Sequence, residues 1–245
     1  MSCVLVIAGC DSSGGAGLVR DVRTLTQLGM GVVCALTAVT AQTDRSVTAV
    51  QALPAPLLRA QLAAALASGR VRAVKIGMLA SADNVAVVAE SLDGAAELGS
   101  VLDPVLAASS GATLLESSAR ELLRKLLLPR VSLLTPNLPE AAALLGEPLA
   151  HSEAQLLAQG AALLELGARA VLLKGGHGRG TDCTDLLFSA RGVQRFSAPR
   201  VGKSRRGSGC ALSAAIAAGL AAGLDLPGAC AQAKNYMNEF FQHGK

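Results

Sequence analysis

The feature that most constrains this chain is a regular alternation between short runs rich in Val, Ile and Leu and longer stretches rich in Ala and Leu. Continuous short apolar runs indicate strands that are buried on both faces, and the stretches between them have the length of helices. The alternation therefore predicts an α/β fold with a mostly parallel central sheet and helices on both faces. Because the 245 residues contain no obvious linker or internal repeat, we expect one domain that spans residues 1–245.

The expected strands are residues 4–8, 31–39, 73–77, 100–103, 131–135 and 170–174. A small antiparallel hairpin at one edge of the sheet is predicted from two further runs, at residues 186–189 and 193–197. The expected helices are residues 16–28, 56–67, 82–91, 117–127, 139–145, 153–166, 208–222 and 227–242.

Composition excludes several classes of protein. Only 16% of the residues are charged and 51% are hydrophobic, which is not the composition of a disordered chain. The apolar runs are interrupted before the ~18–20 residues that a membrane span needs. With one Tyr, four Phe and no Trp, the chain lacks the aromatic platforms of single-strand nucleic-acid binders. We therefore expect neither a membrane nor a nucleic acid as a partner.

The cysteines and the N-terminus bear on the compartment. Six cysteines are scattered without a C-x-x-C pair, so neither a zinc cage nor a disulfide framework is indicated. The first residues read as a strand and lack the basic region of a signal peptide. This pattern favours the reducing cytoplasm.

Gly207-Ser208-Gly209-Cys210 precedes a long run of small helix-forming residues. Two glycines allow a tight turn, and the turn leads into a helix N-terminus with free N–H groups. Such a place favours anions, and phosphates above all. Cys210 lies in the first helical turn, where the same field is expected to lower the thiol pKa. For this segment alone, the alternative is an ordinary loop followed by an unreactive buried cysteine.

Ligands in parallel sheets bind at the carboxyl ends of strands, so the residues after each expected strand are informative. Asp103 ends a buried strand, where a charge is costly unless it is paired or holds a cation. Asn137 and Glu140 have the spacing of a helix-capping pair, and an amide with a carboxylate also suits a hydrated Mg²⁺. Lys174 precedes a glycine-rich stretch and places a cation beside open backbone.

Two side chains suit a small ring. Gln42 offers one acceptor and two donors, which fit a heteroaromatic nitrogen beside an exocyclic amine. Met78 is a flexible apolar side chain that suits the wall of a ring pocket. Taken alone, these residues are a surface glutamine and a core methionine. The turn over residues 11–17 matches neither a Walker A loop nor G-x-G-x-x-G, and its simplest interpretation is a strand-to-helix turn with Ser13 as the N-cap.

Six motifs in this order resemble those of the hydroxymethylpyrimidine/phosphomethylpyrimidine kinases of thiamine biosynthesis. They are AGCDSSGGAG (8–17), TAQ (40–42), KIGML (75–79), TPNLPEA (135–141), LKGGH (173–177) and GSGC (207–210). The resemblance implies a ribokinase-like fold, ATP and Mg²⁺ as cofactors, and a homodimer. It also implies transfer of a phosphoryl group to 4-amino-5-hydroxymethyl-2-methylpyrimidine and then to its monophosphate.

The resemblance further implies roles for individual residues. Those associated with the pyrimidine are Gly9, Asp21, Gln42 and Met78. Those associated with catalysis are Lys174, Gly207, Ser208, Gly209 and Cys210. Those associated with the nucleotide are Asn137, Lys174, Gly176 and Arg206. Those associated with magnesium are Asp103 and Glu140.

Cys210 is the residue with the sharpest chemical hypothesis. A thiolate can serve as the general base for a hydroxyl group if its pKa is lowered towards neutrality. The second phosphorylation attacks with a phosphate oxygen that is already ionised and needs no base. We therefore expect Cys210→Ala to impair the first step more than the second.

The chain departs from the family pattern at Arg205-Arg206, where a Thr-His pair is usual. These arginines suit bidentate binding of phosphate, and the alternative is a solvated basic turn. Two other functions stay open at this point. One is a pyridoxal-type vitamin kinase of the same fold, and the other is a non-catalytic pyrimidine-binding regulator.

Overall fold

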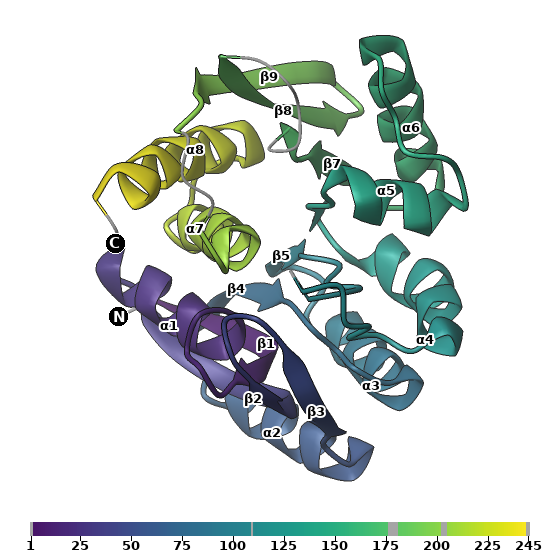
Figure 1. Cartoon of the computed structure of the whole chain (residues 1–245). Helices are drawn as coiled ribbons and strands as arrows, with labels where there is room; N and C mark the ends of the chain where they lie inside the picture. Colours follow the sequence, from purple (N-terminus) through teal and green to yellow (C-terminus); the bar gives the residue numbers. More distant parts are fainter. Residues whose placement is uncertain (1, 109, 176–180, 202–204, 244–245) are drawn as a thin grey trace.

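The computed structural model describes residues 2–108, 110–175, 181–201 and 205–243. Its centre is a nine-stranded sheet in the order β3-β2-β1-β4-β5-β6-β7-β8-β9 (Figure 1). The strands are β1 (Cys3–Asp11), β2 (Gly31–Gln42), β3 (Val47–Ala52), β4 (Val71–Ile76), β5 (Gly99–Leu102), β6 (Leu133–Leu134), β7 (Ala170–Leu173), β8 (Asp182–Ser189) and β9 (Gly192–Pro199). From β2 to β7 neighbouring strands are parallel, which confirms the expected α/β class.

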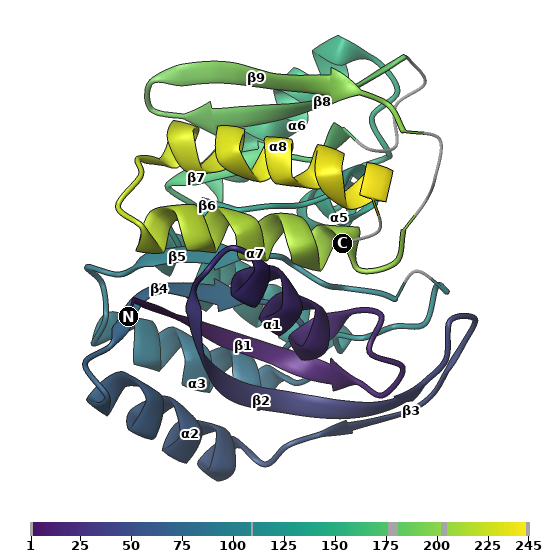
Figure 2. The ribbon, with the colours of Figure 1, turned by 90° about the vertical axis from the view of Figure 1, so that its left-hand side faces the viewer.

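Helices cover both faces of the sheet, as Figures 1 and 2 show. One face carries α1 (Gly17–Gln27), α7 (Ser208–Ala221) and α8 (Leu226–His243). The other face carries α2 (Ala55–Ala67), α3 (Ala82–Asp93), α4 (Ser117–Leu122), α5 (Leu138–Leu145) and α6 (Glu153–Glu165). No helix among the described residues is long and apolar enough to cross a membrane.

The alternation of side chains along the strands creates two hydrophobic cores. In β1, Leu5 and Ile7 belong to the core beneath the α2–α6 face. Val4, Val6 and Ala8 belong to the core beneath α1, α7 and α8. Because successive strand residues point to opposite faces, the unbroken apolar run from Val4 to Ala8 in β1 is what a double-sided sheet requires.

Two expectations about local structure are wrong. The sheet continues into β3, an antiparallel strand beyond β2, which is an edge strand with exposed Thr48, Val50 and Gln51 and so lacks a buried apolar pattern. Ser13 is not the N-cap of α1. That position belongs to Ala16, which has no capping side chain, and the carboxylate of Asp11 accepts the Ala16 N–H at 2.9 Å instead.

The topology fixes where a ligand can bind. The chain leaves β1 for β2 on one side and returns to β4 on the other side of β1. Where strand order reverses in this way, the carboxyl ends of neighbouring parallel strands diverge and leave a crevice. The crevice between β1 and β4 is therefore the expected site.

Candidate active site

A cavity of about 920 Å³ opens at this crevice. Its walls come from the ends of β1, β2, β4, β5 and β7 and from the start of α7. The sequence-predicted residues that line it are Gly9, Gln42, Met78, Asp103, Asn137, Glu140, Lys174, Arg206, Gly207, Ser208, Gly209 and Cys210. Residues that are 200 positions apart in the sequence thus share one cavity.

The turn before α7 has the geometry of an anion hole. Gly207 has φ +74°, a left-handed conformation that favours glycine. A Cβ at this position would also collide with the carbonyl oxygen of Gly15. At Gly209 a Cβ would lie 3.3 Å from both Lys174 Nζ and Asp103 Oδ2. Only a bare backbone leaves room for a ligand between the helix N-terminus and these charges.

Lys174 lies beside the two carboxylates that were assigned to magnesium and forms an ion pair with each. Its Nζ lies 2.7 Å from Asp103 Oδ1 and 3.7 Å from Glu140 Oε2. Burial opposes the charge of Lys174, but Asp103 and Glu140 hold its pKa above the usual range. Burial, with Asp103 beside it, raises the pKa of Glu140 to about 7, although Lys174 opposes the shift. Of the two expected ways to compensate the Asp103 charge, the structure shows the ion pair with Lys174, and its role toward magnesium stays a prediction.

Asn137 and Glu140 form a complete capping box at the start of α5. Asn137 N–H donates to Glu140 Oε2 at 2.8 Å, and Glu140 N–H donates to Asn137 Oδ1 at 2.8 Å. This holds the Glu140 carboxylate at the cavity wall. The capping interpretation is confirmed, and the carboxylate keeps its place beside Lys174.

The donor set at this wall fits a magnesium ion in the way common to phosphate-transfer sites. Mg²⁺ is usually held by one or two carboxylates, with substrate phosphates and water completing the shell. Asp103 Oδ2 faces the anion hole, near Gly209, and Glu140 lies close by. The described residues contain no group of three or more His, Cys, Asp or Glu side chains placed to hold a metal alone.

The expectation of a lowered thiol pKa at Cys210 is wrong. Burial raises the pKa of Cys210 to about 11, with Asp21 and Asp103 adding to the rise. The Lys75 ammonium and a hydrogen bond from Gly17 N–H act in the opposite direction but do not prevail. Desolvation is the largest cause of this shift, and a thiol with a pKa near 11 is protonated at pH 7.

Asp21 is fully buried and paired, outside the cavity lining. Its Oδ2 accepts from Lys75 Nζ at 2.7 Å, and both side chains have almost no exposure. Burial raises the pKa of Asp21 to about 6 despite the pairing, and its Oδ1 has no hydrogen-bond partner. The expected contact of Asp21 with the substrate is therefore replaced by an ion pair with Lys75, a residue that does line the cavity. The available signal was Lys75, a charged residue within the apolar run AVKIG that was expected to form a buried strand.

Gly9, Gln42 and Met78 also line the cavity, and Gly9 and Met78 are neighbours in it. Met78 is buried, and a Cβ at Gly9 would lie 2.9 Å from Met78 Sδ. Gln42 Oε1 accepts from Thr40 Oγ1 at 3.1 Å, which orients the amide. An apolar wall beside an oriented amide suits a small heteroaromatic ring.

A second cavity of about 460 Å³ meets the first one. The two share Asn137, Lys174, Arg205, Ser208 and Gly209. Lys234 and Asp185, which sequence reasoning missed, form an ion pair at 2.7 Å in its wall. Asp185 Oδ1 also accepts from Gly175 N–H at 2.8 Å and so fixes the backbone directly after Lys174. Gly176 lies outside the described residues.

Arg206 is engaged with protein carboxylates. Its Nη2 lies 2.7 Å from Asp11 Oδ2, and its Nη1 lies 2.7 Å from Ser13 Oγ and 3.1 Å from Asp44 Oδ1. The Arg206 guanidinium is therefore occupied by protein groups, so the structure does not show it free to contact a nucleotide. Its low exposure also differs from the alternative of a solvated basic turn. Sequence reasoning missed Asp11 because its partner is distant in the chain.

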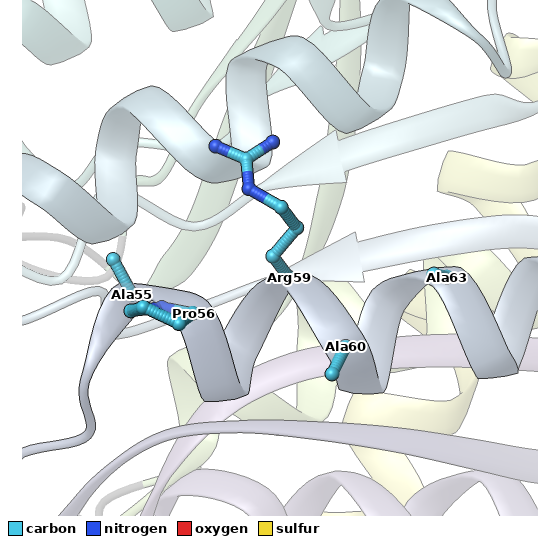
Figure 3. Close-up of a pocket in the computed structure, with 5 residues that line it drawn as sticks. All are labelled: Ala55, Pro56, Arg59, Ala60 and Ala63. Carbon is cyan, nitrogen blue, oxygen red and sulfur yellow. The ribbon is translucent and has the colours of Figure 1, made fainter.

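A third hollow lies on the surface of α2 and contains no comparable chemistry (Figure 3). It is lined by Ala55, Pro56, Arg59, Ala60 and Ala63. Its only charged member, Arg59, forms an exposed ion pair with Glu90 of α3 at 2.5 Å. The two adjoining cavities at the strand ends are the better candidate for a reaction site.

Comparisons with known proteins agree with this geometry. Residues 11–245 match the sequence model of the family described as phosphomethylpyrimidine kinase. A hydroxymethylpyrimidine/phosphomethylpyrimidine kinase from Salmonella typhimurium is 50% identical over 215 residues, which cover 87% of this chain and 81% of the relative.

Solved structures of related kinases have the same fold as this chain. A phosphomethylpyrimidine kinase from Clostridium difficile is 34% identical, with a TM-score of 0.87 over 99% of this chain and 100% of that one. A pyridoxal kinase from Staphylococcus aureus, solved with pyridoxal, is 28% identical, with a TM-score of 0.90 over 99% of this chain and 88% of that one. The expected ribokinase-like fold is confirmed.

Proposed function

Because this chain belongs to the phosphomethylpyrimidine kinase family, we propose that it phosphorylates a pyrimidine in two steps. The first acceptor is the hydroxymethyl group of 4-amino-5-hydroxymethyl-2-methylpyrimidine, and the second is the monophosphate so formed. ATP supplies the phosphoryl group in both steps. The products would serve thiamine biosynthesis.

The observation that carries this proposal is the junction of two cavities at Lys174, Ser208 and Gly209. Phosphoryl transfer needs a donor and an acceptor in line, with charge stabilisation between them. The larger cavity has the oriented amide of Gln42 and the wall of Met78 for a pyrimidine. The smaller cavity would take the nucleotide, so that its phosphates lie at the junction.

The groups at the junction suit the charge that moves during transfer. The N–H groups at the start of α7 and the Lys174 ammonium present positive charge to the phosphoryl oxygens. Asp103 and Glu140 would hold Mg²⁺, which offsets phosphate charge when bound. Since Lys174 already contacts both carboxylates, the protein binds the phosphates and the metal through one connected set of side chains.

Cys210 would act as a hydrogen-bonding neighbour of the acceptor hydroxyl. With a pKa near 11, the thiol is protonated before substrate binds and does not meet the requirement for a general base near neutrality. In a loose transition state, the bond from the attacking oxygen to phosphorus has hardly formed, so the oxygen needs little extra negative charge. Positioning the hydroxyl then matters more than removing its proton early.

The compartment, the oligomeric state and the number of domains are part of this proposal. The six cysteines, which all lie among the described residues, form no disulfide, and the reducing cytoplasm as the compartment stays a prediction from their pattern in the sequence. A homodimer and a single domain spanning residues 1–245 stay predictions from the resemblance and from the sequence. Of the two alternative functions, the pyridoxal-type kinase has weaker sequence support, at 28% identity to a solved member against 50% to a pyrimidine kinase.

Turnover on two alcohols tests the proposal. With ATP and Mg²⁺, we expect ADP release to be saturable with hydroxymethylpyrimidine and to have a higher kcat/KM than with pyridoxal. A preference for pyridoxal would contradict the substrate assignment. Saturable pyrimidine binding in calorimetry without ADP release would instead favour the non-catalytic regulator.

A further inference from the structure

We propose that Arg206 is a positioning residue that holds the anion hole in register with the pyrimidine end of the cavity. This inference rests on the proposed kinase activity. It concerns a residue at which the chain departs from the pattern of the family, where a Thr-His pair is usual. The argument starts from Asp11, the main partner of Arg206.

Asp11 is a buried carboxylate that joins two loops. It is 5% exposed. Its Oδ1 accepts from Ser13 N–H at 3.0 Å and from Ser13 Oγ at 2.9 Å, and its Oδ2 accepts from Ala16 N–H at 2.9 Å. The fourth donor is Arg206 Nη2 at 2.7 Å. Both oxygens are thus satisfied, and removing Arg206 would leave a buried charge without its counter-ion.

The second arm of Arg206 reaches the turn between β2 and β3. Its Nη1 contacts Ser13 Oγ and Asp44 Oδ1, and Asp44 lies in the turn between β2 and β3. The Arg206 side chain is 17% exposed, whereas that of Asp44 is 87% exposed. The Asp11 arm is therefore the strong one, because exposed ion pairs contribute little.

The loop over residues 12–16, which Arg206 contacts through Ser13, touches both the anion hole and the backbone of Gln42. On one side, Gly15 packs so closely on Gly207 that a Cβ at Gly207 would collide with its carbonyl. On the other side, Ser12 Oγ donates to Gln42 O at 3.1 Å and accepts from Gln42 N–H at 2.9 Å. The loop is a spacer between the anion hole and the amide of Gln42.

Arg206 directly precedes Gly207, so its contact with Asp11 fixes the anion hole against this spacer. The guanidinium uses two nitrogens on three partners, and this planar fork cannot be reproduced by a lysine ammonium. An error of about 1 Å in the placement of reacting groups can cost about 100-fold in rate. Arg206 is therefore expected to affect kcat for both acceptors.

The test compares Arg206→Gln, Arg206→Lys and Asp44→Asn with the unmodified chain. We expect Arg206→Gln to lower kcat by about 30- to 100-fold on the alcohol and on the monophosphate alike. Arg206→Lys should recover part of this loss, because it keeps a charge for Asp11. Asp44→Asn should stay within about twofold, as for an exposed pair. The KM for ATP should change little in all three.

A matched control separates positioning from stability. Arg130 makes a similar two-bond pair with Asp93, at 2.7 and 3.1 Å, outside both cavity linings. Because this pair is more exposed than the Arg206–Asp11 pair, Arg130→Gln should change the melting temperature little and leave kcat per folded molecule unchanged. If Arg206→Gln lowered the melting temperature but, like this control, left kcat per folded molecule unchanged, Arg206 would be merely structural and the inference would be overturned.

Two other outcomes are decisive. If Arg206→Gln raised only the KM for the monophosphate, Arg206 would be a phosphate clamp, and the positioning role would be wrong. If the unmodified chain turned over no pyrimidine, the proposed function and the inference would both fall. Turnover by the unmodified chain that Arg206→Gln leaves unchanged would overturn the inference alone.

Discussion

Cys210 is a residue at which burial decides the protonation state of a thiol. The thiol lies in the first turn of α7, yet desolvation raises its pKa to about 11. A neutral thiol can hydrogen-bond a hydroxyl but has little capacity to take its proton at pH 7. Its contribution to the first phosphorylation should therefore be modest.

We expect Cys210→Ala to lower kcat on the alcohol by about tenfold, below the 10²–10⁴-fold typical of general acid–base catalysis. The effect on the monophosphate should be smaller still, since that acceptor is already ionised. Steady-state kinetics on each purified acceptor measure both values. A loss of about 1000-fold confined to the alcohol would contradict the neutral-thiol role and restore the thiolate base.

Several single residues were predictable because their chemistry is local. A carboxylate at the end of a buried strand demands a counter-ion, and Asp103 has one in Lys174 at 2.7 Å. The Asn137/Glu140 spacing predicted a capping box that is present. The pairs Asp21–Lys75 and Asp11–Arg206 were not predicted, because each joins residues that are distant in the sequence and nothing in either local pattern names the partner.

At the scale of elements, the two glycines at the start of α7 have separate tasks. Gly207 has a left-handed backbone and packs on Gly15, so its task concerns the shape of the turn. Gly209 lies in the helix, and its missing side chain leaves space beside Lys174 and Asp103. Alanine at each position should separate folding from activity.

We expect Gly207→Ala to lower both the free energy of unfolding and activity. The left-handed conformation alone costs roughly 1–2 kcal/mol for a residue with a Cβ. Gly209→Ala should leave the melting temperature nearly unchanged and reduce kcat by about 100-fold, because its methyl group displaces the phosphoryl group. Thermal melts and kinetics on both variants provide the comparison, and equal loss of stability in the two would contradict this division.

The capping box of α5 gives a dependence on pH. The pKa of Glu140 is about 7 in the folded protein and 4.5 as its ordinary value. Between these values the folded state binds more protons than the unfolded one, so the free energy of unfolding falls as pH rises from 4.5 to 7. The stabilisation by the protonated carboxyl is complete below pH 4.5 and is lost through pH 7.

Glu140→Gln is the matched variant, since its side-chain oxygen can still accept from Asn137 N–H. Denaturant unfolding without metal should show the fall from pH 4.5 to 7 in the unmodified chain and a smaller one in the variant. Parallel stability curves across this range would show that Glu140 titrates in the usual acidic region.

For the whole molecule, the sequence was most informative where elements are buried on both sides. The parallel strands and their helices follow from apolar runs, and their carboxyl ends located the site. The edge strand β3 was not predicted, because its side chains are largely exposed and show no pattern of buried apolar residues. Within the predicted helix over residues 117–127, the last turn is a π-helix at Leu123–Leu127, a local change of hydrogen-bond register that helical periodicity does not indicate.

The most direct test of the central claim is phosphorus NMR of the protein with ATP, Mg²⁺ and hydroxymethylpyrimidine. The two adjoining cavities and the family predict a pyrimidine monophosphate signal that is followed by a diphosphate signal, while ATP is converted to ADP. Monophosphate alone would limit the chain to the first step. ATP that remains intact, with the pyrimidine unphosphorylated, would contradict the assignment of this chain as a kinase.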